Sequence, residues 1–315
     1  MVAMIRCVRP GVSDGIAVSI DGRPTMSLVS AGRIIVLLAA CSAGLPLAGC
    51  SATDVVNVLV PGKGYVEKAG LSYGDGPRQK LDVYVPAAAA KPAPVVIFFY
   101  GGGWTAGDKD MYLFAGQAFA SRGFVTVIPD YRLYPEVSYP AFLQDAAAAV
   151  RWTVDHIAGQ GGDPRRIYLV GHSAGAYIAA MLTLDRRWLG AVGLDPRRQI
   201  RAMVGLAGPY DFLPLDTDQL KAIFGPPDQW PSTQPINHVE GDGPPMLLVA
   251  GAEDDVVRPA NVAHLAGRIR AKGGLVEEKY YYGIGHMKLV GALAAPLRFV
   301  APVLDDTADF MNDNP

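Results

Sequence analysis

Short apolar runs recur along most of the chain and alternate with segments of helical length. Seven runs have the length and the β-branched or aromatic content of strands, at residues 80–86, 95–100, 124–129, 167–170, 202–207, 246–250 and 275–282. Continuous apolar strands separated by helix-length segments are typical of a parallel sheet that helices cover on both faces. The pattern therefore predicts one α/β domain built around a mostly parallel sheet.

One strand leads directly into a serine flanked by glycines. Residues 171–175 read Gly-His-Ser-Ala-Gly, between the run 167–170 and a small-residue stretch, 176–181, that predicts the start of a helix. A serine on such a sharp turn has strained backbone angles, and a Cβ on either glycine would collide with the neighbouring strand or helix. The pattern alone occurs by chance, but here its strand and helix are present. We predict a nucleophile elbow with Ser173 as the nucleophile.

A serine hydroxyl is a poor nucleophile, so it needs a base to take its proton and a third group to orient that base. The chain offers five histidines, His156, His172, His238, His264 and His286. In this architecture the order is serine, acid and then histidine, which excludes the first two. His286 lies in a Gly-Ile-Gly-His turn after the last predicted strand, whereas His264 falls in a predicted helix over 259–272. We predict His286 as the base, with His238 and His264 as rivals.

The acid is expected at the end of a strand between the serine and the histidine. The run 246–250 ends in three carboxylates, Glu253, Asp254 and Asp255. We choose Asp254, because the spacing to Val257 lets one carboxylate turn inward while the valine packs below it. Asp255 is the nearest rival, and a solvated acidic turn that caps the following helix is compatible with either residue.

A glycine triplet follows another buried strand. Residues 101–104 read Gly-Gly-Gly-Trp after the run 95–100. Attack on an acyl carbon creates an oxyanion that backbone N–H groups can stabilise, and glycines let the backbone approach it without obstruction. We predict that Gly102, Gly103 and Ala174 supply these N–H groups. A merely flexible loop is the alternative.

These motifs resemble the α/β-hydrolase superfamily, and more narrowly the esterases similar to hormone-sensitive lipase that carry a His-Gly-Gly-Gly loop. This chain departs from the pattern at Tyr100, where that family usually has histidine. Residues 171–176 and the Gly-Pro-Tyr-Asp segment at 208–211 are closer to the bifunctional feruloyl/acetylxylan esterase-like, kynurenine formamidase-like and isoprenylcysteine methylesterase-like branch. The resemblance runs from about residue 64 to about residue 312. It implies an α/β-hydrolase fold over 64–315, with an eight-stranded sheet and a small cap.

The resemblance also implies a serine carboxylesterase that works through an acyl-enzyme and needs neither cofactor nor metal. The expected partner is a small-molecule ester, and the short connection 208–242 favours short-chain, acetyl-type esters over long-chain lipids. An amide hydrolase of arylformamidase or peptidase type would use the same triad. A non-catalytic binding lipoprotein is a third alternative.

Composition narrows the classes of partner. The chain has 315 residues, of which 50% are hydrophobic, enough to bury a large core. Its formal net charge of −2 gives no reason to expect nucleic acid as a partner. The oligomeric state is left open.

The first 49 residues are typical of a secretion signal. Arg33 precedes an uncharged stretch, 34–50, whose apolar part is short for a membrane span of about 20 residues. Leu47 to Cys50 read Leu-Ala-Gly-Cys, which matches the bacterial lipobox and predicts lipid attachment at Cys50. An ordinary signal peptide or a membrane anchor is the alternative. A start at Met26 would give a signal of ordinary length.

Lipid attachment would have two consequences. Since the three cysteines are Cys7, Cys41 and Cys50, the processed chain would hold no cysteine for a disulfide. Residues 50–63 would act as a tether. We therefore expect a protein of the bacterial cell envelope, at the outer membrane or facing the periplasm, that reaches the membrane only through its N-terminal lipid.

Overall fold

The computed structural model describes residues 52–88 and 92–315. These residues belong to one unit, Cys50–Pro315. The predicted signal segment 1–49, the alternative start at Met26 and the lipid-attachment residue Cys50 lie outside the described residues.

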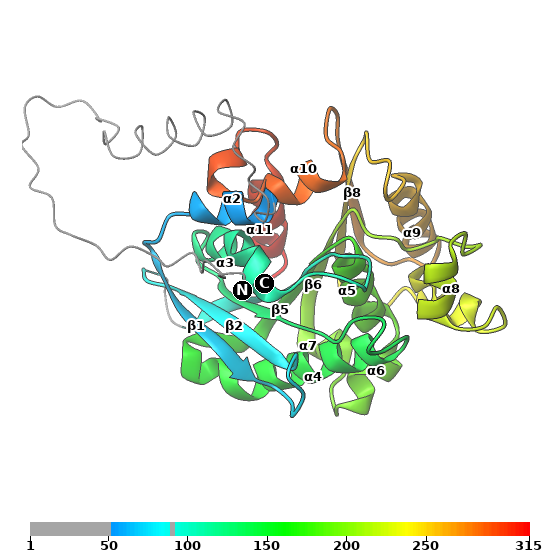
Figure 1. Ribbon diagram of the computed structural model, residues 1–315, viewed down its shortest axis with the longest axis horizontal. Coiled ribbons are helices and arrows are strands. Elements are labelled where there is room, and N and C mark those ends of the chain that lie inside the picture. Colours follow the sequence, from blue (N-terminus) through cyan, green and yellow to red (C-terminus); the bar gives the residue numbers. More distant parts are fainter. Residues whose placement is uncertain (1–51, 89–91) are drawn as a thin grey trace, which may run out of the picture. The chain divides into compact units, whose positions relative to one another are not determined.

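A twisted sheet of eight strands forms the centre of the described domain (Figure 1), in the order β1-β2-β4-β3-β5-β6-β7-β8. The strands are β1 (Tyr65–Ser72), β2 (Lys80–Pro86), β3 (Ala93–Phe99), β4 (Val125–Pro129), β5 (Gly162–His172), β6 (Ile200–Leu206), β7 (Met246–Gly251) and β8 (Val276–Tyr281). The first two pairs, β1 with β2 and β2 with β4, are antiparallel, and every other pair is parallel. The expected mostly parallel sheet of eight strands is confirmed.

Strand β1 lies outside the seven apolar runs from which the sheet was predicted. Its residues are half-buried or exposed throughout, because it is the antiparallel edge of the sheet. Strand β5 is longer than its apolar run, since it begins at Gly162 with polar residues that the run does not contain. The search for such runs finds the buried strands and the edge strand β8, and overlooks β1, the antiparallel edge.

Helices cover both faces of the sheet (Figure 1). The α-helices are α2 (Ala52–Val58), α3 (Leu113–Ala120), α4 (Ala141–His156), α5 (Ala174–Leu184), α6 (Arg186–Ala191), α7 (Pro196–Gln199), α8 (Asp218–Phe224), α9 (Ala260–Ala271), α10 (His286–Gly291) and α11 (Val303–Asp313). The 3₁₀ helices are η1 (Lys109–Tyr112), η2 (Ile157–Gln160), η3 (Trp230–Thr233), η4 (Pro235–His238) and η5 (Ala295–Leu297). Helices α2, α3 and α11 form one packed group, and α4, α5 and α6 form another. Every residue of α5 is buried, as its apolar sequence requires.

The topology brings the predicted chemistry to one edge of the sheet. Strands β3, β5, β7 and β8 run parallel, so their carboxyl ends meet at the same edge. The glycine loop follows β3, Ser173 follows β5, Asp254 follows β7 and His286 follows β8. The connection 207–245 between β6 and β7 holds only α8, η3 and η4, which is the small cap expected from the resemblance.

The segment expected to act as a tether, 50–63, contains the helix α2, and this helix is held to the domain. The Asn57 amide donates to the carbonyl oxygens of Asp110 and the next residue, at 2.9 and 3.1 Å. It also accepts the N–H of Phe114 at 3.1 Å, in the first turn of α3. Residues 52–58 are therefore not a free spacer, because one side chain satisfies three main-chain groups of η1 and α3.

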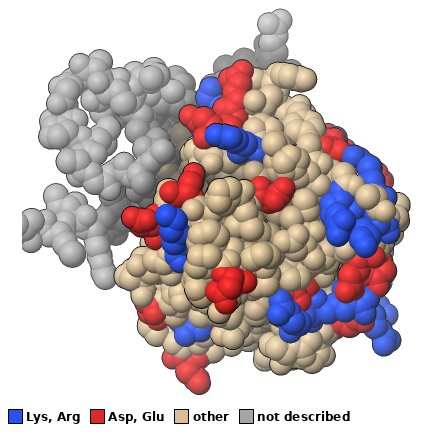
Figure 2. Space-filling model, turned by 90° about the vertical axis from the view of Figure 1, so that its right-hand side faces the viewer, with Lys and Arg blue, Asp and Glu red and all other residues tan. Residues whose placement is uncertain are grey.

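Charged side chains of both signs are interspersed on the face of the domain that Figure 2 shows. Several form ion pairs, for example Arg197 with Asp242 at 2.7 Å and with Glu240 at 2.8 Å. Within residues 52–88 and 92–315, no helix has both the length and the apolar character needed to cross a membrane.

Candidate active site

Ser173 occupies a strained turn between β5 and α5. Its φ is 53° and its ψ is −122°, a region that residues with a side chain rarely adopt. A Cβ on Gly171 would collide with the carbonyl of Gly175, and one on Gly175 would collide with the carbonyl of Phe99 in β3. The steric reason predicted for the two glycines is confirmed. Ala174 is the first residue of α5, so its N–H is among those that have no partner within the helix.

Asp254 and His286 form a buried pair. His286 Nδ1 lies 2.7 Å from Asp254 Oδ2, and the carboxylate side chain is inaccessible to solvent. The other carboxylate oxygen accepts the backbone N–H groups of Val256 and Val257, at 2.9 and 2.8 Å. The rival Asp255 is exposed. The loop therefore fixes one carboxylate inward, and that carboxylate is Asp254.

The histidine of the elbow connects this pair to the nucleophile turn. The rings of His172 and His286 lie 4.7 Å apart, and His172 Nε2 donates to the His286 carbonyl oxygen at 3.3 Å. Burial, with a smaller contribution from His286, lowers the pKa of His172 to about 3, so this ring is neutral. A Cβ on Gly101 would lie 2.9 Å from His172 Nδ1 and 3.0 Å from the Ser173 Cβ. The elbow, the histidine loop and the glycine loop therefore meet.

The structure does not bring the other histidines to this place. His264 is exposed on α9 and lies 2.7 Å from a carboxylate oxygen of Asp211. His238 bonds to the carbonyl oxygen of Ser232 at 2.8 Å, within the cap. His156 stacks on a tryptophan one turn earlier in α4.

The glycine loop has an unusual backbone. Three successive residues, Gly102, Gly103 and Trp104, have φ values of 132°, 58° and 60°. The carbonyl oxygen of Gly102 accepts the N–H groups of Thr105 and Ala106, at 3.1 and 3.0 Å. A Cβ on Gly102 would collide with the carbonyl of Ala106, whereas one on Gly103 would meet nothing closer than 4.0 Å. The two glycines therefore serve different steric needs.

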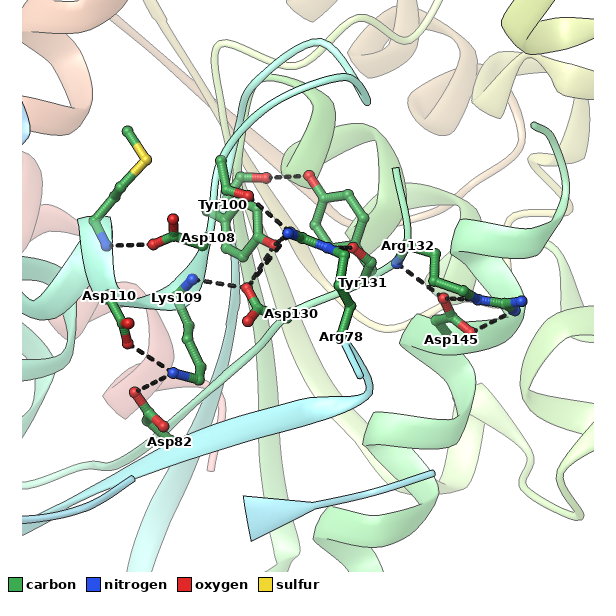
Figure 3. Close-up of polar contacts among 12 residues, drawn as sticks. Arg78, Asp82, Tyr100, Asp108, Lys109, Asp110, Asp130, Tyr131, Arg132 and Asp145 are labelled. Carbon is green, nitrogen blue, oxygen red and sulfur yellow. Dashed lines mark hydrogen bonds and ion pairs between the residues drawn. The ribbon is translucent and has the colours of Figure 1, made fainter. Parts of the chain in front are cut away.

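Figure 3 shows the polar residues behind this loop. The sequence motifs related only Tyr100 to the support of the loop, although Asp130, Tyr131, Arg132 and Asp145 match the pattern of the resembling family. The Tyr100 hydroxyl donates to Asp130 Oδ1 at 2.8 Å and accepts from Arg78 Nη2 at 2.9 Å. The tyrosine at position 100, where the resembling family has histidine, indicated that the loop is supported differently in this protein. No motif marked Arg78, which lies 22 residues before Tyr100.

In the described part of the chain, no group of three or more His, Cys, Asp or Glu residues is arranged to hold a metal ion. The polar groups that meet at the sheet edge are a hydroxyl, an imidazole, a carboxylate and main-chain N–H groups. This set suits nucleophilic attack on an acyl carbon.

Comparison with known proteins decides the family. The family model described as BD-FAE matches residues 81–269, which is more than half of the chain. The chain belongs to the BD-FAE family. The match spans the glycine loop, the elbow and the acid, whereas His286 lies beyond its end.

Relatives of this BD-FAE chain include a probable isoprenylcysteine alpha-carbonyl methylesterase from Arabidopsis thaliana. It is 31% identical over 255 residues, which cover 74% of this chain and 53% of the relative. Esterase LipC from Mycobacterium tuberculosis is 29% identical over 225 residues, 66% of this chain and 56% of that protein. The chain therefore spans about half the length of these relatives.

Solved structures support the fold. Esterase B from Lactobacillus rhamnosis superposes with a TM-score of 0.72 at 20% identity, covering 90% of this chain and 97% of that structure. With the mostly parallel eight-stranded sheet, this likeness establishes the α/β-hydrolase fold for the BD-FAE chain.

Proposed function

We propose that this protein is a serine carboxylesterase. The observation that carries the proposal is the buried His286–Asp254 pair, set beside the strained Ser173 turn at the edge where the glycine loop also ends. Membership of the BD-FAE family supports it, and the two relatives described above are named as esterases.

The proposed first step is acylation of the serine. His286 Nδ1 faces Asp254, which leaves Nε2 as the nitrogen that takes the Ser173 proton. The Ser173 oxygen bonds to the ester carbon, and the carbonyl electrons move to its oxygen. When that intermediate collapses, the bond to the alcohol oxygen breaks, and His286 returns the proton to the departing alcohol. Asp254 orients the imidazole and stabilises its cation.

The N–H groups of Gly102, Gly103 and Ala174 are the proposed donors to the oxyanion. They lie on a loop and at a helix start where the backbone packs closely, because a Cβ on Gly102 would meet the Ala106 carbonyl and one on Gly175 the Phe99 carbonyl. Donors held in place before the reaction lower the barrier, because the protein does not have to reorganise as charge develops. Water, deprotonated by His286, then attacks the acyl carbon and releases the acid.

The proposed substrates are esters of short acyl groups, of the acetyl type. Trp104, which follows the glycine donors, is packed at ring-centroid distances of 4.9 Å from Phe224 and 5.2 Å from Tyr177. Phe212 stacks on the same tryptophan at 6.2 Å. Phe212 and Phe224 come from the cap connection 207–245, so rings of the cap pack on the residue that follows the glycine donors. The proposal is that this packing limits the length of the acyl chain.

The test of the function uses the purified protein, its Ser173→Ala variant and Ser138→Ala, a change at an exposed serine. A fluorophosphonate should label the protein and Ser138→Ala once, on Ser173, and leave Ser173→Ala unlabelled. Turnover of p-nitrophenyl acetate should be lost only in Ser173→Ala. Full turnover by Ser173→Ala would overturn the proposal, and faster cleavage of p-nitroacetanilide than of the acetate would replace it with amide hydrolysis.

The acyl preference has its own test. Comparison of p-nitrophenyl acetate, butyrate and laurate should give the highest kcat/KM for acetate or butyrate. Phe212→Ala should raise the laurate-to-acetate ratio by about tenfold, because even one methylene in a hydrophobic pocket is worth on the order of 1–3 kcal/mol of discrimination. Phe299→Ala, at an exposed phenylalanine, is the control. An unchanged ratio in Phe212→Ala would remove the cluster from the explanation.

For the cell, we propose a lipid-anchored envelope protein. The support is the Leu-Ala-Gly-Cys pattern at residues 47–50 after a short apolar stretch. Growth with an alkyne analogue of palmitate should label the protein and Cys41→Ser, and should not label Cys50→Ser. Labelling of Cys50→Ser at the level of the unaltered protein would refute the anchor.

A further inference from the structure

The loop that carries two of the proposed N–H donors has backbone angles that its residues do not favour by themselves. Residues 102–104 and Gly107 all have positive φ, and Trp104 is the residue for which such angles are most costly. Glycines lose much conformational entropy on folding, so a loop with this composition needs contacts from elsewhere to stay in one conformation. The described residues provide them from behind the loop.

Arg78 reaches the loop from the connection between β1 and β2. Its Nη2 atom donates to the Tyr100 hydroxyl at 2.9 Å and to the Gly107 carbonyl oxygen at 2.7 Å, so one group contacts both ends of the loop. Its Nε atom donates to the carbonyl oxygen of Tyr131, just beyond β4, at 3.0 Å. The guanidinium therefore joins the start and the end of the loop to the neighbouring strand (Figure 3).

The residues around the Arg78 guanidinium are held in place by hydrogen bonds of their own. Asp130 Oδ1 accepts the Tyr100 hydroxyl and the backbone N–H of Lys109, both at 2.8 Å, and lies 3.7 Å from Arg78 Nη2. The Tyr131 hydroxyl donates to the Tyr100 carbonyl oxygen at 2.8 Å, and the two rings stack at 4.8 Å. Burial raises the pKa of Tyr100 well above its usual range, so the phenol remains a neutral donor.

We propose that Arg78 is a positioning residue of the esterase, which holds the N–H groups of Gly102 and Gly103 in place by joining Tyr100 to Gly107. This inference rests on the proposed function. Arg78 acts through the loop, because its contacts are with the two ends of that loop and with Tyr131. The proposal also explains the tyrosine at position 100, where the resembling family has histidine. The longer phenol reaches both Asp130 and Arg78.

Arginine suits this place better than lysine. A planar guanidinium carries five N–H donors in a fixed fork, whereas an ammonium is a compact charge on a flexible stem. Arg78 uses two of its nitrogens to contact acceptors on three separate segments. Lysine would keep the charge near Asp130 and lose this geometry, so Arg78→Lys tests position separately from charge.

The experiment compares Arg78→Lys with Arg166→Lys in the full chain. Arg166 is the matched control, because it also donates to a backbone carbonyl and a carboxylate, those of Pro92 and Asp163, at the start of β5 and far from the carboxyl edge. For p-nitrophenyl acetate, Arg78→Lys should lower kcat by about 10- to 100-fold with KM within about twofold, since misplaced donors weaken only the transition state. Arg166→Lys should keep both constants within about twofold.

A second measurement separates positioning from mere stability. An aryl trifluoromethyl ketone forms a hemiketal oxyanion with a reactive serine, so its inhibition constant should rise in Arg78→Lys by the factor by which kcat/KM falls. Tyr100→Phe keeps the ring stacking, removes the phenol contacts and should lower kcat in the same way. The double variant should be little worse than Arg78→Lys alone, because the two groups act in one network.

The outcomes are distinct. If Arg78→Lys and Tyr100→Phe change the melting temperature but keep kcat and the inhibition constant, the contact is structural and the inference is overturned. If Arg166→Lys lowers kcat equally, the effect is not specific to the loop and the inference fails as well. If Ser173→Ala retains turnover, or the unaltered protein has none, the proposed function fails and takes this inference with it. If only Ser173→Ala is inactive, the function stands without the role of Arg78.

Discussion

The two sides of Ser173 are held in place by different kinds of contact. On the side of Asp254 and His286, main-chain hydrogen bonds join the two loops that carry these residues. The N–H of Glu253 donates to the Ile284 carbonyl at 3.1 Å, and that of Ala252 donates to the Tyr281 carbonyl at 2.8 Å. On the glycine side, the supports are the side chains of Arg78, Tyr100, Asp130 and Tyr131.

This difference determines how each side tolerates change. Main-chain hydrogen bonds survive most substitutions, so the histidine side depends on the few side chains that take part in the proposed chemistry. The glycine side depends on residues that never touch the substrate in the proposed mechanism. Substitutions on the two sides should therefore fail in different ways.

The largest effect is expected at the acid. Asp254→Asn should lower kcat by about ten-thousand-fold, because the amide favours the wrong tautomer of His286 while leaving the shape intact. Asp255→Asn, next to it and exposed, should change kcat by no more than about twofold. Steady-state kinetics on p-nitrophenyl acetate measure both, and a greater loss in Asp255→Asn would assign the acid to the neighbouring residue.

The next effect compares two adjacent glycines that both keep their N–H groups. In Gly102→Ala the new methyl group collides with the Ala106 carbonyl, so the donors move and kcat should fall by about 100- to 1000-fold. In Gly103→Ala the methyl group enters open space at a φ of 58°, which should cost about 1–2 kcal/mol of stability and little activity. Equal losses of kcat in the two variants would contradict the claim that Gly102 is needed to keep the loop in position.

A smaller effect concerns stability on the glycine side. Buried Asp145 accepts three hydrogen bonds from Arg132, between 2.8 and 2.9 Å, and one from Gln79, the residue after Arg78. Asp145→Asn should lower the free energy of unfolding by about 2–3 kcal/mol, since charged partners lose their acceptor. Asp155→Asn breaks an exposed ion pair on α4 and should cost about 0.5 kcal/mol or less. Urea titration distinguishes them, and similar midpoints would contradict the prediction.

The smallest effect, taken per pH unit, is a pH dependence at the residue between the two sides. His172 has a folded pKa of about 3, below its usual 6.5, so the unfolded chain binds more protons between these values. Its contribution therefore makes stability rise with pH over this interval, by at most about 1.4 kcal/mol per pH unit, and then level off. His172→Gln should flatten that rise in urea titrations, whereas His156→Gln, at an exposed histidine, should not. Parallel pH curves for His172→Gln and the unaltered protein would exclude the effect.

The sequence predicted the histidine side more fully than the glycine side, for a physical reason. Asp254 and His286 follow the predicted strands β7 and β8 within a few residues, and the carboxyl ends of parallel strands meet, so order along the chain is enough to place them. Arg78 lies on a connection next to an antiparallel edge strand, and its partners follow two other strands. Only the packed fold brings such residues together, so Tyr100 was recognisable as unusual, whereas its contacts with Arg78, Asp130 and Tyr131 were not predicted.

The N-terminal region illustrates the same limit. Residues 50–63 were predicted to act as a tether that follows a lipid-attached Cys50, and a seven-residue helix has little intrinsic stability. Its Asn57 amide nevertheless joins α2 to acceptors and a donor that lie more than 50 residues away, and Val56 packs against the core. Tertiary contacts of this kind override local composition.

The contacts of Asn57 also bear on how the protein is best produced. A recombinant chain is commonly begun at the first residue of the recognisable domain, which here would be near residue 64. Such a chain would lack α2 and leave the Phe114 N–H without its Asn57 acceptor, one element away from the glycine loop. Retaining residues 52–58 preserves that contact, so the choice of first residue is part of the design of every experiment described above.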